Sequence, residues 1–560
     1  MRALRTYSVK RYLLYAAALF SLGILLSITS TYYFANKVAN QIEELQFDQA
    51  DLRDKQIRDI SRTLRYLDFS ISNPFIAFTS LVATTPQTFV PTSRAVDAAA
   101  SFTASLSDLL AQQSASKKSL LTLAPELGAA MPDLNQALLS LSQIRIGGLF
   151  GSLDKQLAPF RQDAQRVLQS TTAVTPLLEI APKLAGYRAP RKYLIAFQNS
   201  AEARGTGGIL GAYAVMSIDK GNVTFAAFGS NAGLTQLNDT PIMMPDEFVR
   251  TYNDDPGIWQ NSNISPHFPY GAQIWLALWK NQFKEDLDGV LTFDPTSLSY
   301  LLKATGPVQV QGKEITAENV VKVTLSDLYQ MYQFDNNARK LFLIDVIREV
   351  SAKIEAKSFS TPDLISQLIY PLNQHRVLFY STKPAEQKVI ERSQISGAVS
   401  RKPDNQYRLI IQNTSGNKMD YYLKRSLTLE SLSCGKTTKT KVTFTLTNTA
   451  SADTKLPSYV VGRLDLNRPD GVKNSYGTRA IIMPPVETHL ISTKDLTTNK
   501  KFGFLVRERD HKGVGIQVDL AAGQSQSFEL IFSGGVGALT SHQQPLVIDQ
   551  KDTIIDRCTE

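Results

Sequence analysis

The 560-residue sequence predicts a multidomain α+β protein with an N-terminal transmembrane helix, a helical stalk, a mixed α/β core domain and a C-terminal immunoglobulin-like β-sandwich. A long uncharged run is followed by apolar residues at helical spacing, then by alternating strands and helices, then by strands alone. The chain also exceeds the length that one hydrophobic core usually supports. We place the cytoplasmic N-terminus at residues 1–11, the transmembrane helix at 12–34, the helical region at 35–187, the α/β core at 188–385 and the β-sandwich at 386–560.

Composition and charge restrict the class of protein. Charged residues make up 20% and hydrophobic residues 43% of the sequence, which is typical of globular chains. The formal net charge is +9. The sequence has no basic run with interleaved aromatics, no zinc-spaced Cys and His and no helix-turn-helix pattern, so we do not expect nucleic acid as a partner. Because the excess of lysine and arginine is spread along the chain, we expect it to favour an anionic membrane or cell-wall surface.

Residues 12–34 predict the membrane anchor. At about 1.5 Å per residue, this uncharged run is long enough to cross a hydrocarbon core of about 30 Å. Four cations precede it, namely Arg2, Arg5, Lys10 and Arg11. By the positive-inside rule the chain is then a single-pass protein of the cell membrane, with most of its residues extracytoplasmic. The alternative is a cleaved signal peptide that ends near Ala35 or Ala39, and it exports the remaining chain equally.

The sequence contains two cysteines, Cys434 and Cys558. In an exported chain they are either a disulfide that closes the last domain or two buried thiols far apart. Neither has a nearby histidine, which argues against a metal site or a catalytic thiol.

The region before residue 188 predicts helices. Residues 36–65 form a polar stem, and residues 91–185 are rich in Ala, Leu, Ser and Gln with apolar residues at helical spacing. Helix-breaking residues divide the second stretch at Pro125, Pro132, Gly147–Gly148 and Pro159. We therefore expect several short helices packed as a bundle.

From Arg191 the pattern changes to alternating strands and helices. A buried strand at residues 193–197 is followed by a polar and then glycine-rich loop at 198–211, and by two strands joined by a turn at 219–222. A strand follows the glycines where a phosphate-binding helix would begin, so a dinucleotide site is not expected. Further strands are expected at 288–293 and 308–310, and helices at 270–284, 295–302, 337–356 and from Ala317, capped by Thr316.

The last third predicts strands only. Three of them are residues 407–411, 441–447 and 526–532, spaced by turn residues as in an immunoglobulin-like sandwich. The histidines of this region, His489, His511 and His542, are predicted to be surface or loop residues and not ligands.

Several segments resemble the bacterial domain-of-unknown-function family 4012, whose members are membrane proteins without established chemistry. The resemblance rests on Lys192-Tyr-Leu-Ile-Ala-Phe-Gln-Asn-Ser-Ala-Glu-Ala-Arg-Gly-Thr-Gly-Gly208, Asp288-Gly-Val-Leu-Thr-Phe-Asp-Pro295, Lys303-Ala-Thr-Gly-Pro307 and Ile315-Thr-Ala-Glu-Asn319. The β-rich tail with Leu456-Pro-Ser-Tyr459 also fits.

The α/β core is also distantly similar to the LytR-CpsA-Psr ligases, which transfer glycopolymers from polyprenyl-pyrophosphate carriers to the cell wall. This resemblance implies that Arg204 and Arg339 contact phosphate, and that Glu202 or Asn199 lies near a magnesium ion. The sequence departs from the ligases at two places, where Phe228-Gly-Ser-Asn231 replaces Pro-Arg-Asp and Arg204-Gly-Thr-Gly207 replaces Arg-Ser-Asp-Thr. Both changes remove charged groups, so catalytic residues are not assigned.

Two functions follow as expectations. The first is a membrane-anchored protein of the cell envelope that binds or transfers a polyprenyl-pyrophosphate-linked glycopolymer, with the lipid bilayer and a cell-wall polymer as partners. The second is a non-enzymatic envelope scaffold or adhesion protein that binds through its β-sandwich. Clustering of Arg204, Glu202 and Arg339 around one cleft favours the first, and glycine turns packed without a cleft favour the second.

Overall fold

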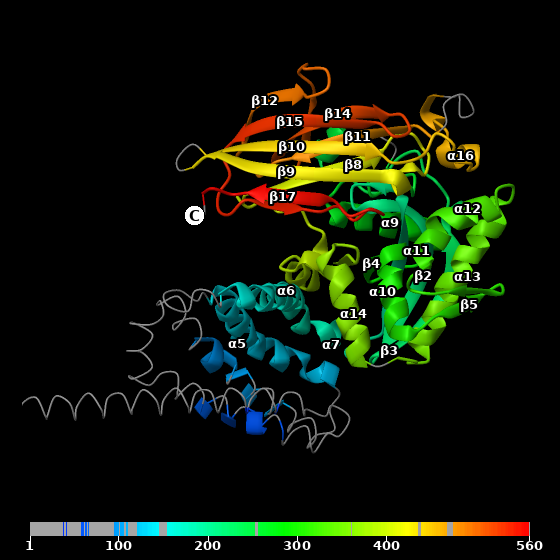
Figure 1. Cartoon of the computed structure of the whole chain (residues 1–560). Helices are drawn as coiled ribbons and strands as arrows, with labels where there is room; N and C mark the ends of the chain where they lie inside the picture. The colour runs from blue at the N-terminus through cyan, green and yellow to red at the C-terminus, as the bar shows by residue number, and fades with distance from the viewer. Residues whose placement is uncertain are drawn as a thin grey trace, which may run out of the picture. The chain divides into compact units, whose positions relative to one another are not determined.

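A computed structural model of the chain (Figure 1) describes residues 120–144, 154–252, 256–359, 361–434, 438–466 and 474–558, with short helical stretches between residues 37 and 109. It contains helices and several sheets, and it divides into two compact units, Met1–Arg188 and Ala189–Glu560. The expected transmembrane helix at residues 12–34 lies outside the described residues. Within the described part, none of the helices has the length and apolar character needed to cross a bilayer.

Among the described residues of the first unit, four helical segments have both ends placed. They are η1 (Leu120–Leu123), α5 (Ala124–Gln143), α6 (Asp154–Leu178) and α7 (Ala181–Leu184). α5 packs against α6, and at Gly128 the two backbones approach so closely that an added Cβ would lie 3.2 Å from the Cβ of Leu178. Glycine at this position therefore sets the distance between the two helices.

Two of the expected helix breaks are wrong. α5 continues through Pro132 and α6 continues through Pro159. A proline inside a helix removes one hydrogen bond and pushes against the preceding turn, but a long helix packed along a neighbour tolerates that cost. Pro125 does lie in the first turn of α5, where its missing N–H is not needed.

The second unit begins with a five-stranded mixed sheet in the order β3-β2-β1-β4-β7. The strands are β1 (Arg191–Arg204), β2 (Gly207–Asp219), β3 (Asn222–Ser230), β4 (Gly289–Phe293) and β7 (Phe379–Ser381). β1 runs parallel to β4, and the other neighbours are antiparallel. The expected turn between β2 and β3 is confirmed, with positive φ angles at Lys220 and Gly221.

The expected loop at residues 198–211 is instead part of the sheet. β1 continues to Arg204, and β2 resumes at Gly207 after a two-residue turn. Glycine makes this possible at Gly208, because a Cβ there would lie only 2.0 Å from the carbonyl oxygen of Asn199. Residues 198–211, whose polar character predicts a loop, therefore form the bulged ends of two paired strands and the tight turn between them.

Helices cover both faces of this sheet. Leu194 and Val290 face a tryptophan-rich core under α8 (Asp246–Thr251) and α9 (Phe268–Phe283), whereas Phe293 faces a second core. The elements around that second core are α10 (Pro295–Thr305), β5 (Val308–Val310), β6 (Lys313–Ile315), α11 (Val320–Lys322), η4 (Val323–Asp327), α12 (Leu328–Met331), α13 (Asn336–Glu355) and α14 (Thr361–Asn373). A short helix α15 (Pro384–Ile390) follows β7.

The helix expected from Ala317 begins later. Thr316 accepts hydrogen bonds from the backbone of Glu318 and Asn319, at 3.2 and 3.3 Å, and so forms a local turn. The helical residues of α11 start at Val320. The threonine therefore stabilises the turn before the helix and is not its N-cap.

Two further five-stranded sheets enclose one core (Figure 1), with the orders β12-β15-β10-β9-β17 and β13-β14-β11-β8-β16. The strands are β8 (Gln406–Asn413), β9 (Leu423–Ser433), β10 (Lys439–Asn448), β11 (Tyr476–Met483), β12 (His489–Asp495), β13 (Phe504–Glu508), β14 (His511–Leu520), β15 (Ser525–Ser533), β16 (Thr540–His542) and β17 (Lys551–Ile555). Short helical segments η6 (Met419–Tyr422) and α16 (Ser458–Val461) connect them. Alternate residues such as Leu427, Leu429 and Phe444 point inward.

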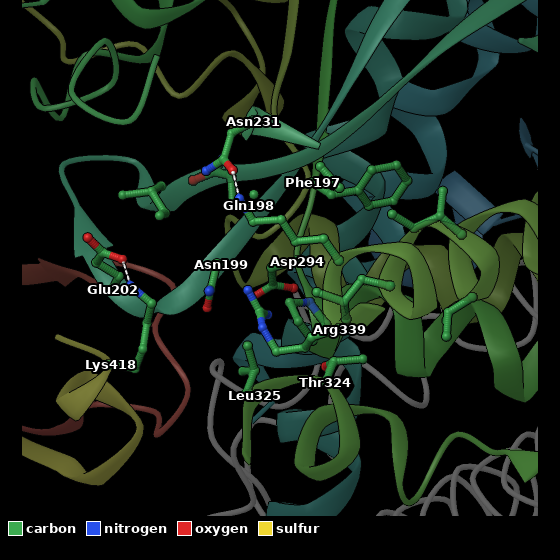
Figure 2. Close-up of a pocket in the computed structure, with 18 of the residues that line it drawn as sticks. Phe197, Gln198, Asn199, Glu202, Asn231, Asp294, Thr324, Leu325, Arg339 and Lys418 are labelled. Atoms are coloured by element: carbon green, nitrogen blue, oxygen red, sulfur yellow. Dashed lines mark hydrogen bonds and ion pairs between the residues drawn. The ribbon is translucent and has the colours of Figure 1, made fainter. Parts of the chain in front are cut away.

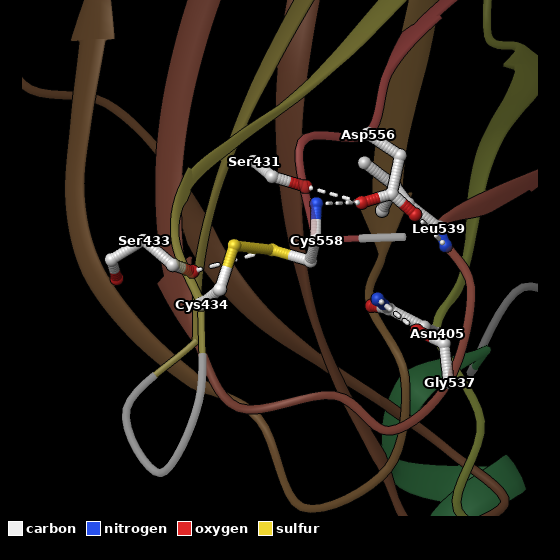
Figure 3. The surroundings of a disulfide bond; sticks show 8 residues. All are labelled: Asn405, Ser431, Ser433, Cys434, Gly537, Leu539, Asp556 and Cys558. Atoms are coloured by element: carbon white, nitrogen blue, oxygen red, sulfur yellow. Dashed lines mark hydrogen bonds between the residues drawn. A yellow bond between two sulfur atoms is a disulfide. The ribbon is translucent and has the colours of Figure 1, made fainter. Parts of the chain in front are cut away.

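The two cysteines form a disulfide (Figure 3). The bond joins Cys434, which follows β9, to Cys558, which follows β17, across a sequence separation of 124 residues. Asp556 supports the same corner, since its carboxylate accepts hydrogen bonds from Ser431 Oγ at 3.0 Å and from the backbone N–H of Leu539 at 2.8 Å. The C-terminal strand is thereby fixed to the sandwich.

β1 ties the α/β region to the sandwich. Ala203, near its end, is part of the sandwich core, and its N–H donates to the carboxylate of Asp420 at 3.0 Å. Asp420 is buried and also accepts from Tyr476 Oη at 2.5 Å and Asn413 Nδ2 at 2.7 Å. Burial raises the pKa of Asp420, although these hydrogen bonds act in the opposite direction.

The prediction for two histidines is wrong. His511 is 1% exposed, and its ring nitrogens lie 2.6 Å from the carbonyl oxygen of Pro484 and 2.8 Å from that of Ser400. His542 lies in β16, and its ring centre is 4.2 Å from that of His375. His489, in contrast, is exposed at the start of β12.

Candidate functional site

A cleft of about 300 Å³ opens on the face of the mixed sheet that α10 and α13 cover (Figure 2). Its apolar lining comes from Phe197, Ile209, Leu298, Leu325, Leu343, Val346 and Ile347. Its polar lining comes from Asn199, Glu202, Asn231, Gln260, Arg339, Lys340, Lys418 and Tyr459. Figure 2 places Glu202 and Lys418 toward one end of the view and Phe197 toward the other. The cleft therefore combines an apolar wall with charged groups, at a volume typical of small-molecule sites.

Arg339 enters the cleft from the first turn of α13. Its Nε and Nη2 donate to Asn336 Oδ1 at 3.0 and 2.8 Å, and its guanidinium lies 4.5 Å from the ring centre of Tyr329. Asp335 caps the helix through Ala338 N–H at 2.9 Å, which fixes this turn. Among the described carboxylates, none forms an ion pair with this guanidinium. A neutral amide and an aromatic ring thus hold a full positive charge in place.

Lys340 follows on the same helix turn, and its Nζ donates to Asn231 Oδ1 at 3.2 Å. Burial lowers the pKa of Lys340, and the positive charges of Arg339 and Lys418 lower it further. An anion bound beside this ammonium would reduce the repulsion and favour the charged form. Lys340 is therefore a cation of the cleft that an anionic ligand would stabilise.

Glu202 and Lys418 face each other across the end of the cleft. Lys418 Nζ donates to Glu202 Oε2, and Arg204 Nη2 lies 3.8 Å from Glu202 Oε1. Glu202 comes from β1 and Lys418 from the segment before η6 of the sandwich, so the ion pair crosses the junction of the two regions. One carboxylate thus compensates part of the positive charge around the cleft.

Asn199 lines the cleft from the bulged part of β1. Its Nδ2 donates to Tyr329 Oη at 3.1 Å, and its Oδ1 accepts from the N–H of Ala201 at 3.1 Å. Both ends of the amide therefore already have a partner within the protein. The side chain positions Tyr329 under the guanidinium of Arg339.

Asp294 also lines the cleft, but its charge is compensated. It is the N-cap of α10, accepting from Ser297 N–H at 2.6 Å, and it accepts from the buried Arg376 at 2.6 Å. Arg376 in turn donates to Asp549 at 2.7 Å and to the carbonyl oxygen of Leu546 at 3.0 Å. The cleft wall is thereby connected to the C-terminal segment of the chain.

Arg204 does not line the cleft. Its guanidinium is buried and donates to the carbonyl oxygens of Gln260 at 3.0 Å and Ala203 at 2.9 Å, and to Asn261 Oδ1 at 3.2 Å. A further contact at 3.3 Å reaches the carbonyl oxygen of Asn413 in the sandwich. These partners use the donors that a phosphate would need. The structure therefore places Arg204 as a structural anchor beside the cleft.

The residues at the cleft do not fit a magnesium ion. Mg²⁺ prefers free oxygen ligands in octahedral geometry, whereas Glu202 is engaged by two cations and Asp294 by Arg376 and its own helix. No group of three potential metal ligands occurs among the residues that the structure describes.

Sequence reasoning identified part of this site. The structure brings Asn199, Glu202 and Arg339 to the cleft but leaves Arg204 outside it. Lys340 was missed, although an Arg-Lys pair ahead of apolar residues at helical spacing is a readable signal. Lys418 and Tyr459 carry no such signal, because they reach the cleft from the sandwich region, far along the chain.

Comparison with known proteins bears on the α/β region. No curated protein and no solved structure matches the chain. The segment from residue 188 to residue 329, which contains β1 to β4 and much of the cleft, matches the family described as "Protein of unknown function (DUF4012)", and this supports the expected family resemblance over these residues.

Proposed function

We propose that the cleft binds the phosphate-bearing end of a polyprenyl-pyrophosphate-linked glycopolymer. The observation that supports this is the pairing of an apolar wall with Arg339, Lys340 and Lys418, of which only Lys418 has a carboxylate partner among the described residues. A polyprenyl diphosphate has the matching chemistry, since its hydrocarbon chain suits the wall and its phosphates suit guanidinium and ammonium groups.

We place this activity on the outer side of a bacterial cell membrane. The uncharged run at residues 12–34 and the cations before it support an anchor with the bulk of the chain extracytoplasmic. The disulfide between Cys434 and Cys558 is consistent with an oxidising compartment. The lipid bilayer and a cell-wall polymer are the partners that this location implies.

The contacts favour binding over transfer. A LytR-CpsA-Psr type of ligase needs arginines and a carboxylate free to hold the diphosphate and its metal ion. Here Arg204 is used in four contacts within the fold, and Glu202 pairs with Lys418. The proposal therefore assigns the cleft to recognition of the carrier lipid, and it assigns no catalytic residue.

Binding of geranylgeranyl diphosphate to the detergent-solubilised full chain tests the proposal. We expect saturable binding that Lys340→Gln together with Arg339→Gln weakens at least about tenfold, because two charge-assisted contacts are lost. Arg348→Gln is the control for charge outside the cleft, since it removes one charge from the exposed side of the same helix, against the two removed in the double variant. Geranylgeraniol, which lacks the phosphates, should bind weakly and equally to all variants.

Two results would contradict the proposal. Equal affinity for the alcohol and the diphosphate would mean that the cations do not recognise phosphate. An equal loss in Arg348→Gln would mean that the effect is long-range electrostatics and not contact in the cleft.

A further inference from the structure

A second groove, of about 670 Å³, follows the edge strand β13. It is lined by α8, by β11 and by four consecutive residues of β13, Phe504–Arg507. β13 pairs with β14 on one side only, and no described strand pairs with its other side. The groove therefore gives access to the backbone of a sheet edge.

The hairpin register indicates which backbone groups face the groove. Glu508 and His511 pair across the two-residue turn Arg509–Asp510, both of which have positive φ. In an antiparallel ladder, alternate residues direct both backbone groups to the partner strand. Those of Glu508 point to β14, so those of Leu505 and Arg507 point outward. The hydrogen bond from Thr251 Oγ1 to the carbonyl oxygen of Arg507, at 2.8 Å, agrees with this direction.

The side chains around the groove carry an excess of positive charge. Arg250, Arg479 and Arg507 line it, against the single carboxylate of Glu247. Glu247 already accepts from Arg401 at 3.3 Å. Arg250 and Arg507 are exposed and form no ion pair among the described residues. The groove thus has the charge to attract an anionic partner.

Apolar surface lies next to this charge. The side chain of Phe504 lies over Gly515 of β14, where an added Cβ would be 2.5 Å from its ring, and Phe504 remains 47% exposed. Leu505 is 60% exposed. Proteins usually cover or charge such an edge, because exposed apolar edge strands pair with other chains.

We propose that β13 receives an extended acidic segment of a partner protein as an additional strand. Leu505 offers an outward N–H and C=O and Arg507 an outward N–H, which a peptide backbone satisfies at the strand repeat. Leu505 and Arg507 lie on one face of the sheet and Phe504 on the other. Acidic side chains on one face of the added strand therefore reach Arg507, and apolar side chains on its other face cover Phe504. The inference concerns a different site from the cleft and does not depend on it.

A fluorescently labelled peptide of about eight residues, alternating glutamate and valine, tests the inference on the full chain. We expect saturable binding, with protection of the Leu505 and Arg507 amides from hydrogen exchange. Leu505→Pro removes an outward N–H without taking a hydrogen bond from β14, and it should weaken binding at least about tenfold. Leu505→Ala keeps that N–H and is the matched control, with a loss of less than about threefold.

Charge is tested separately. Arg507→Glu should weaken binding of the glutamate–valine peptide at least about tenfold and strengthen binding of a lysine–valine peptide, because the charge at this position then repels glutamate and attracts lysine. Equal effects of Leu505→Pro and Leu505→Ala would overturn strand addition. Binding of oligogalacturonate without binding of the peptide would assign the groove to an acidic polysaccharide and overturn the proposal, and so would no binding of either.

Discussion

Arg204 and Arg339 are both buried arginines near one cleft, yet their contacts differ. The guanidinium of Arg204 donates to oxygens of Gln260, Asn261 and Asn413. That of Arg339 donates to the amide of Asn336 and lies over the ring of Tyr329. We expect Arg204→Ala to lower the free energy of unfolding by about 3 kcal/mol, because several buried acceptors and a carboxylate lose their partner. Arg339→Ala should lower it by about 1 kcal/mol or less and weaken diphosphate binding.

Urea denaturation of both variants, followed by circular dichroism, measures the difference. A comparable loss in the two variants would contradict the assignment of Arg204 to the fold. Selective loss of lipid binding in a fully stable Arg204→Ala protein would return this arginine to the binding site.

For single residues, the sequence predicts which side chains lie near the cleft better than it predicts the contacts that these side chains make. Asn199, Glu202 and Arg339 line the cleft, and each comes shortly after the start of a predicted helix or the end of a predicted strand. The role of Arg204 depends on the carbonyl oxygens of Gln260 and of Asn413 in the sandwich. These residues lie far from Arg204 in the sequence, so no local pattern predicts the contacts. Local chemistry is readable in a sequence, but the identity of a hydrogen-bond partner is not.

His542 of β16 lies against His375, which follows α14, with the two ring planes tilted by 39°. Burial lowers the pKa of His375 to about 4 and that of His542 well below its usual value, and the positive charge of Arg408 acts in the same direction on both. In the unfolded chain both imidazoles take up a proton near pH 6.5, whereas in the folded chain they stay neutral to a lower pH. The stability that depends on neutral histidines is therefore complete above pH 6.5 and is lost as the pH falls toward 4. We expect a loss of about 3 kcal/mol between pH 7 and pH 4.

The difference in urea midpoint between the native chain and His542→Gln isolates this effect from that of the carboxylates. The native chain should lose more stability than the variant on acidification. His489→Gln, at an exposed position of β12, is the control and should behave as the native chain does. Parallel pH profiles of the native chain and His542→Gln would contradict a role for the histidine pair.

Element boundaries follow the sequence where one signal dominates. Asp294 and Pro295 begin α10 where a cap and a first-turn proline predict it. The prediction fails where packing decides, as at Pro132, which α5 contains, and at Gly205–Thr206, a tight turn inside what reads as a long loop. Tertiary contacts outweigh weak local preferences at both places.

Over the whole second unit, the C-terminal segment connects regions that are far apart in sequence. Gln544 Nε2 donates to the carbonyl oxygens of Arg204 and Ile411, and Arg376 binds both Asp294 and Asp549. β17 then pairs with β9, and the disulfide follows it directly. The cleft wall, the sandwich and the chain end therefore share one set of buried contacts, which a sequence-based division at residue 385 does not anticipate.

Removing the disulfide should destabilise this unit as one body. A bridge between residues 124 apart contributes up to about 4–5 kcal/mol by restricting the unfolded chain. We expect Cys434→Ser together with Cys558→Ser to lower the free energy of unfolding of residues 189–560 by about that amount. Urea should still unfold these residues in one transition, because Arg376 and Gln544 still couple the two regions. Native chain treated with dithiothreitol should match the variant, and the variant should not respond to it. Separate transitions for the α/β region and the sandwich in the variant would show that the disulfide, and not the buried contacts, makes them unfold together.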